Sequence, residues 1–129
     1  MINTSLMKNK KGLVMGVANE RSIAWAIAKT LSNSGADVAL TYQGGPLKKR
    51  VTPLANEINS PLILECNVEN ENDILKTFKE IKKKWKTIDF VVHAIAFSNR
   101  EELKGKYLNT TKDNFKKTMD ISCYSFTAV

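Results

Sequence analysis

Two hydrophobic periods alternate along this chain. Short apolar runs at residues 12–18, 37–42, 61–68 and 88–97 predict four strands. Between and after them, apolar residues recur every three or four positions, which is the period of a helix with one buried face. Strand and helix in strict alternation indicate parallel strands joined by crossover helices. The pattern therefore predicts an α/β chain with a parallel sheet in the strand order 3-2-1-4.

Four helices are expected, and each has a predicted buried stripe. The first begins at Ser22 and ends at Asn33-Ser34-Gly35, which is a stop signal. The third has Asn70 as its cap, and Thr111 opens the last one, which has no stop signal before Val129. The stripes are Ile23, Ile27 and Leu31; Leu47, Val51, Leu54 and Ile58; Ile74, Phe78, Ile81 and Trp85; and Phe115, Met119, Ser122 and Phe126. Pro53 lies within the second stripe and predicts a kinked or split helix.

Composition narrows the class of protein. The 129 residues are 43% hydrophobic and 26% charged, which is ordinary for a globular domain. Neither an apolar run long enough to cross a membrane nor a signal-peptide core at "MINTSLMKNKKG" is present. We therefore expect a cytoplasmic protein with no membrane partner.

The net charge of +7 has two possible interpretations, a nucleic-acid-binding surface or lysines scattered over solvated helix faces. Only Arg21, Arg50 and Arg100 are arginines among the 20 basic residues, and phosphate or base readers usually favour arginine. The second interpretation is favoured, and no nucleic-acid partner is expected.

Cysteine and histidine suggest no metal chemistry. Cys66 and Cys123 are far apart and form no paired motif, so both are interpreted as reduced packing residues. His93 has no cysteine or carboxylate at ligand spacing, which favours a hydrogen-bonded core histidine. No metal site is predicted.

The stretch "GLVMGVANERSIAW" joins the first strand to the first helix. The N–H groups at a helix N-terminus attract phosphate, and Gly16 permits a close approach at the strand end. A single glycine is also compatible with an ordinary strand-to-helix turn, so the loop alone leaves both interpretations open.

Five segments in this order, "GVANERSIAWAIA", "ALTYQ", "LECNV", "VVHAIAF" and "DISCYSF", resemble bacterial NADH-dependent enoyl-acyl carrier protein reductases of fatty-acid biosynthesis. These enzymes are divergent members of the short-chain dehydrogenase/reductase superfamily. The resemblance runs from about Lys10 to Val129 and implies a Rossmann-like doubly wound parallel sheet, truncated after the fourth strand and the start of the following helix. Residues 1–129 would then be the N-terminal part of a single NAD(P)-binding domain.

The resemblance implies a cofactor site. It assigns the pyrophosphate and ribose contacts to Gly16, Ser22 and Ile23, the adenosine ribose to Gln43, the adenine pocket to Asn67 and Val68, the strand end beside the cofactor to Ile95, the nicotinamide side to Ile121 and the substrate side to Ser98. NADH is the expected cofactor.

NADPH stays open as a less favoured cofactor. No acidic residue stands beside Gln43 to bind a ribose hydroxyl, while Lys48, Lys49 and Arg50 follow closely.

The resemblance also implies a catalytic tyrosine followed seven residues later by a lysine on one helix. Tyr42 and Lys49 have this spacing, but Gly44, Gly45 and Pro46 between them break any helix. We therefore assign no catalytic residue and expect the 129-residue chain alone to be inactive.

The partners that the resemblance implies are an enoyl substrate on acyl carrier protein and either further copies of the chain or a complementary C-terminal chain. Another short-chain NAD(P)H reductase and an inactive nucleotide-binding fragment are the alternatives.

Overall fold

The computed structural model describes residues 5–129. These residues form two compact units, one ending at Ala94 and the other comprising Ile95–Val129. Each unit is described by itself below.

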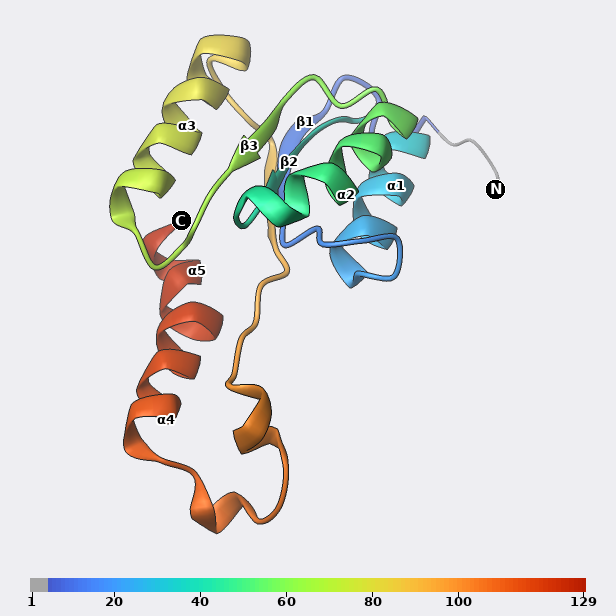
Figure 1. Cartoon of the computed structure of the whole chain (residues 1–129). Coiled ribbons are helices and arrows are strands. Elements are labelled where there is room, and N and C mark those ends of the chain that lie inside the picture. Colours follow the sequence, from blue (N-terminus) through green and yellow to red (C-terminus); the bar gives the residue numbers. More distant parts are fainter. Residues whose placement is uncertain (1–4) are drawn as a thin grey trace. The chain divides into compact units, whose positions relative to one another are not determined.

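The first unit is built on a four-stranded parallel sheet. Its strands are β1 (Lys11–Met15), β2 (Asp37–Tyr42), β3 (Ile63–Glu65) and β4 (Phe90–His93). They lie in the order β3-β2-β1-β4, and all three pairings are parallel (Figure 1). The predicted strand order is confirmed.

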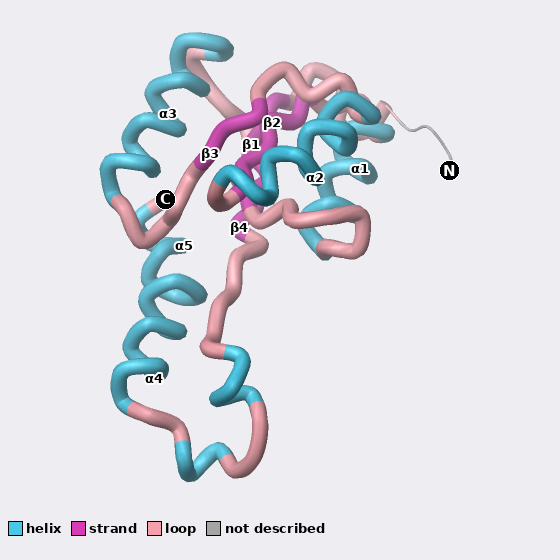
Figure 2. Tube along the Cα trace, in the orientation of Figure 1, coloured by secondary structure: helices cyan, strands magenta, loops and turns pink. Residues whose placement is uncertain are grey.

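Three helices connect these strands: α1 (Ile23–Asn33), α2 (Gly45–Glu57) and α3 (Glu71–Trp85). Figure 2 shows α1 and α2 on one side of the strands and α3 on the other, as in a doubly wound sheet. The predicted cap of α3 is confirmed, because the Asn70 side chain accepts a hydrogen bond from the Asn72 N–H. Of the two alternatives predicted at Pro53, the split helix is wrong, since one continuous helix includes Pro53, and the kink stays a prediction.

The main hydrophobic core lies between the sheet and helices α1 and α2. Alternate strand residues enter it, as the pleat of a strand requires. Val14 in β1 and Val38, Leu40 and Tyr42 in β2 belong to this cluster, and Phe90 packs against it from β4.

The stripe predicted for α1 is wrong at its first residue. Ile23 is 76% exposed, while Ala24, Trp25 and Ala28 are buried. The helix turns its small residues and Trp25 toward the sheet, so the buried face begins one residue later than the spacing of the larger aliphatic residues suggests.

Three strands are shorter than predicted. β1 ends at Met15 because Gly16 takes a φ of 99°, a backbone conformation that ends the extended strand. β3 covers only Ile63–Glu65, and β4 ends at His93 instead of residue 97. β4 lies at the edge of the described sheet, and its Val91 side chain is 38% exposed.

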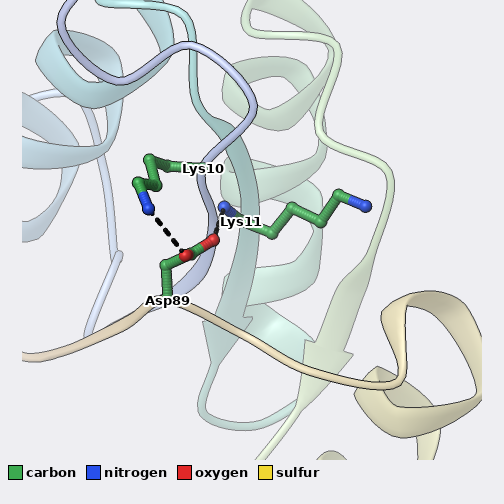
Figure 3. Close-up of polar contacts among 3 residues, drawn as sticks. All are labelled: Lys10, Lys11 and Asp89. Carbon is green, nitrogen blue, oxygen red and sulfur yellow. Dashed lines mark hydrogen bonds and ion pairs between the residues drawn. The ribbon is translucent and has the colours of Figure 1, made fainter.

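Asp89 connects the beginnings of β1 and β4 (Figure 3). Its carboxylate accepts a hydrogen bond from the Lys11 N–H at 2.9 Å and an ion-paired hydrogen bond from the Lys10 ammonium at 3.0 Å. The Asp89 N–H in turn donates to the Lys11 carbonyl at 2.7 Å. These bonds, the one from the Lys11 N–H first, lower the pKa of the Asp89 carboxyl below its ordinary value.

Because of this lowered pKa, the free energy of unfolding of the first unit depends on pH in the acidic range. A carboxyl whose pKa is lower in the folded state stabilises the fold above its ordinary pKa, and this contribution disappears as the pH falls through the lowered pKa. We expect Asp89→Asn to reduce the free energy of unfolding near neutral pH and to make it less sensitive to pH below about 4. Urea denaturation at several pH values measures both. Asp37→Asn, at the exposed first residue of β2, is the charge-matched control, and equal pH profiles for the two variants would contradict the prediction.

The second unit consists of a loop and an interrupted helix. Two short 3₁₀ turns, Arg100–Leu103 and Tyr107–Asn109, precede α4 (Lys112–Met119). A π-helical turn, Asp120–Tyr124, then leads into α5 (Ser125–Ala128). Thr111 caps α4 as predicted, because its hydroxyl accepts from the Asn114 N–H at 3.2 Å.

The stripe predicted for this last helix is mostly exposed. Phe115, Met119 and Phe126 are 49%, 44% and 68% exposed. Cys123 is exposed too, so interpreting it as a packing residue is wrong, whereas Cys66 is buried and both thiols are free.

Candidate functional site

The loop between β1 and α1 begins at Gly16, directly after the carboxyl end of β1. The φ of 99° at Gly16 lies in a region that residues with a Cβ rarely adopt. Glycine at this position lets the backbone leave the strand sharply, and this turn sets the course of the loop that leads to Ser22.

Ser22 organises the loop that precedes it. Its hydroxyl accepts from the Ala18 N–H at 3.3 Å and the Asn19 N–H at 3.5 Å, and it donates to the Asn19 carbonyl at 2.5 Å. The side chain therefore makes no capping hydrogen bond to α1. The Ser22 hydroxyl instead stabilises the loop, because it bonds to backbone groups of Ala18 and Asn19.

The first N–H groups of α1 are consequently available. Within residues 5–129, no acceptor is found for the N–H groups of Ile23 and Ala24, while Trp25 and Ala26 donate to the Ser22 carbonyl. Unpaired N–H groups at the start of a helix carry partial positive charge and suit a phosphate group. The exposed Ile23 side chain marks the solvent-accessible side of this helix start.

Gln43 follows the carboxyl end of β2 and is exposed. The next residue, Gly44, has a φ of 78° and turns the chain into α2. Lys48, Lys49 and Arg50 are exposed in the first turns of that helix.

Asn67 and Val68 follow the carboxyl end of β3 and are half-buried. The Asn67 side-chain oxygen accepts from the Glu69 N–H at 3.1 Å, and the Asn67 N–H donates to the Asp73 carboxylate at 3.2 Å. The Glu69 N–H thus occupies one acceptor position of the Asn67 side-chain oxygen, and within residues 5–129 no donor is found for the other. The sequence analysis did not predict this contact between Asn67 and Asp73.

Cys66 lies beside this turn, directly after β3. Its N–H donates to the Tyr42 carbonyl at 2.9 Å, and burial raises the pKa of its thiol. The thiol is therefore kept protonated and unreactive near neutral pH.

Three of these positions follow neighbouring parallel strands. Gly16, Gln43 and Asn67 come after β1, β2 and β3, so all three stand at the carboxyl edge of the sheet. Ligands of open α/β sheets bind outside this edge. Of the residues assigned from sequence, the first unit brings together Gly16, Ser22, Gln43 and Asn67, with their neighbours Ile23 and Val68.

The remaining assigned residues belong to the second unit. Ile95 is its first residue and is half-buried, and Ile121 is buried in the π-helical turn. The half-buried Ser98 accepts a hydrogen bond from the Asn114 side-chain amide at 3.0 Å.

Sequence reasoning missed Asn114 and misread Ser122. Asn114 is 5% exposed although it is polar, and Ser122, placed in an apolar stripe, hydrogen-bonds to both backbone groups of Phe97. The available signal was a polar residue at a buried helix position, which is rare unless hydrogen bonds satisfy it.

His93 ends β4 and is half-buried. In the described part of the chain, no group of three or more histidine, cysteine, aspartate or glutamate side chains is arranged to hold a metal ion. No helix of residues 5–129 has the length and apolarity needed to span a membrane.

A parallel sheet ordered β3-β2-β1-β4, with a glycine turn and an open helix N-terminus at its carboxyl edge, defines a Rossmann-type nucleotide-binding fold. The family model described as enoyl-(acyl carrier protein) reductase matches residues 16–129. The chain belongs to this family.

Individual proteins that resemble this chain belong to the same family. The chain is 56% identical over 126 residues to the protein named enoyl-[acyl-carrier-protein] reductase [NADH] 1 of Rhizobium meliloti, covering 98% of this chain and 46% of that protein. The Anaplasma phagocytophilum reductase, solved in complex with NAD, is 47% identical with a TM-score of 0.93, covering 98% of this chain and 48% of the other. The Bacillus cereus reductase, solved with NADP+ and indole naphthyridinone, is 44% identical with a TM-score of 0.92, covering 96% and 49%.

The chain therefore spans about half the length of the relatives it matches. The identity is high over nearly the whole chain, so the resemblance inferred from the five sequence segments is confirmed at the level of the family.

Proposed function

We propose that this chain is the cofactor-binding N-terminal part of an NADH-dependent enoyl-[acyl-carrier-protein] reductase of fatty-acid biosynthesis. The observation that carries the proposal is the carboxyl edge of the sheet, where the open start of α1 stands beside positions that follow β2 and β3. The relatives, which are named enoyl-[acyl-carrier-protein] reductases, support it. In this proposal both units belong to one Rossmann-type domain of a cytoplasmic protein.

The first unit would hold most of the cofactor. The N–H groups of Ile23 and Ala24 would bind the pyrophosphate, and the hydroxyl of Ser22 would keep the loop from Gly16 in the shape that exposes them. Gln43 would bind the adenosine ribose. The free acceptor position of Asn67 and the half-buried Val68 would receive the adenine.

The second unit would supply the nicotinamide and substrate sides, with Ile95 beside the cofactor, Ile121 against the nicotinamide and Ser98 toward the enoyl substrate. In the proposed reaction NADH supplies a hydride to the double bond. Acyl carrier protein would present the enoyl group, and either further copies of this chain or a complementary C-terminal chain would complete the assembly.

NADPH is the second candidate cofactor. Lys48, Lys49 and Arg50 are exposed just beyond Gln43, where a 2′-phosphate on the ribose would meet positive charge. The NADP+ complex of the Bacillus cereus relative supports keeping this candidate. We favour NADH because the Rhizobium meliloti relative, which is more similar to this chain, is named for it.

Titration of the purified chain with NADH tests the proposed site. We expect Ser22→Ala to weaken binding about five- to tenfold, because the loop loses the hydroxyl that shapes it, and Gln43→Ala to weaken it about threefold. Ser32→Ala is the matched control, since it removes a serine hydroxyl from α1 whose partner is the Ile58 carbonyl at 3.4 Å. Unchanged affinity in both Ser22→Ala and Gln43→Ala would show that the nucleotide binds elsewhere.

The same titration with NADPH separates the two cofactors. We expect weaker binding than with NADH, and Lys49→Gln should change neither affinity by more than about twofold. Tighter NADPH binding that Lys49→Gln abolishes would instead establish NADPH as the cofactor.

A further inference from the structure

The segment Phe97–Asn99 of the second unit is tied to the interrupted helix by side-chain hydrogen bonds. The Ser122 hydroxyl accepts from the Phe97 N–H at 2.9 Å and donates to the Phe97 carbonyl at 3.2 Å. Asn114 accepts from the Asn99 N–H through its side-chain oxygen and donates to the Ser98 hydroxyl through its nitrogen, both at 3.0 Å. Three consecutive residues of the segment are therefore held by two helix side chains.

The burial of Asn114 makes these bonds strong constraints. The residue is 5% exposed, and a buried amide without partners would destabilise the unit. Each polar atom of its side chain has a partner in the segment, so a displacement of Ser98 or Asn99 would break a hydrogen bond to a buried group. The Lys117 ammonium also lies 5.1 Å from the centroid of the Phe97 ring, which adds a cation–π contact.

Ser122 belongs to an unusual part of the helix. It lies in the π-helical turn Asp120–Tyr124, directly after the buried Ile121. Single π turns interrupt α-helices frequently at functional sites, because the extra residue redirects the side chains around it. The same turn thus carries Ile121 and the hydroxyl that holds Phe97.

We propose that Asn114 and Ser122 are positioning residues that fix the Ser98 hydroxyl for the enoyl substrate. This rests on the proposed function, in which Ser98 faces that substrate. In this proposal both residues act through the segment and not by contact with the substrate. They act by holding the segment Phe97–Asn99 in one conformation before the substrate binds, so that binding costs less ordering of the chain.

Amide hydrogen exchange of the 129-residue chain tests whether Asn114 and Ser122 hold the segment Phe97–Asn99 in place. We expect Asn114→Ala to speed exchange of the Asn99 N–H about tenfold or more and Ser122→Ala to do the same for Phe97, since each loses its acceptor. Asn114→Asp keeps a side-chain oxygen for Asn99 and should retain protection. Thr118→Val is the control: it lies between the two on the helix, and its buried hydroxyl has no hydrogen-bond partner in the described residues.

Kinetics of a fusion protein test the role in positioning. The chain is joined to the C-terminal half of the Rhizobium meliloti relative and assayed with a crotonyl thioester and NADH. We expect Asn114→Ala to raise KM for the thioester about three- to tenfold while KM for NADH changes by less than twofold. A merely structural role would instead lower stability and change both KM values together.

The outcomes separate this proposal from the proposed function. Unchanged exchange at Asn99 and Phe97 in the variants, or equal changes in both KM values, would overturn the positioning role even in an active fusion. A fusion without any turnover would contradict the proposed function, and the exchange rates would still decide whether Asn114 and Ser122 hold the segment.

Discussion

The 129-residue chain alone is expected to reduce no enoyl thioester at a measurable rate, although we expect it to bind NADH. The reaction needs a group that donates a proton or stabilises the enolate, and no residue of this chain is assigned that role. A group that donates a proton or stabilises the enolate contributes about 10²- to 10⁴-fold in rate, and positioning of the nicotinamide contributes more. The pair Tyr42 and Lys49 does not supply this group, because Tyr42 ends β2 whereas Lys49 lies in α2 after the turn at Gly44.

NADH oxidation with a crotonyl thioester measures this directly. The fusion with the C-terminal half of the Rhizobium meliloti relative is the positive control, and its Tyr42→Phe variant should keep full activity. Ordinary turnover by the isolated chain would show that the active site lies within these residues and has been assigned wrongly. Loss of activity in Tyr42→Phe, with the fold intact, would make Tyr42 a catalytic residue after all.

The substitution Gly12→Ala is expected to destabilise the first unit by about 1–3 kcal/mol. Gly12 of β1 is in register with Phe90 of β4, and the aromatic ring covers the glycine. A Cβ at position 12 would lie 2.3 Å from the Phe90 ring, which is far inside a normal contact distance. The ring would have to move out of the space beside the core cluster, and the entropic gain of an alanine, about 0.4–1 kcal/mol, would not compensate.

Urea denaturation compares this variant with two others. Gly45→Ala is the matched control: no heavy atom lies within 4 Å of the added Cβ, so its stability should be unchanged or slightly higher. Combining Gly12→Ala with Phe90→Leu should cost less than the sum of the single changes, because the smaller side chain makes room. Strict additivity would indicate that the ring and the glycine do not interact.

The strand order was predictable from sequence because hydrophobic runs, helical periods and turn residues all agree in the first unit. The resemblance assigned Gly16, Gln43 and Asn67 to the cofactor, and parallel strands place these positions at one edge of the sheet. The resemblance to the reductase family was predictable because five segments occurred in the family's order.

Other features depend on contacts that a linear pattern does not contain. Ile23 is exposed because α1 turns its small residues toward the sheet, and periodicity alone does not say which of two adjacent stripes is buried. The strand at 88–97 ends early, and its edge position depends on which strands pair with it. The bonds of Asn114 and Ser122 to the segment Phe97–Asn99 join residues that are distant in sequence, so neither helical period nor residue type predicted them.

The edge position of β4 also has a consequence during protein synthesis. One side of this strand has no neighbour in the described sheet, and Val91 remains partly exposed on it. In a relative of twice this length, the ribosome needs on the order of ten seconds to make the second half. For that time the nascent chain carries an apolar strand with unpaired backbone groups, which is a template for pairing with other chains. For the 129-residue chain, whose β4 has the same exposed edge, we expect a higher soluble yield when expression is at lower temperature or with chaperones that bind nascent chains.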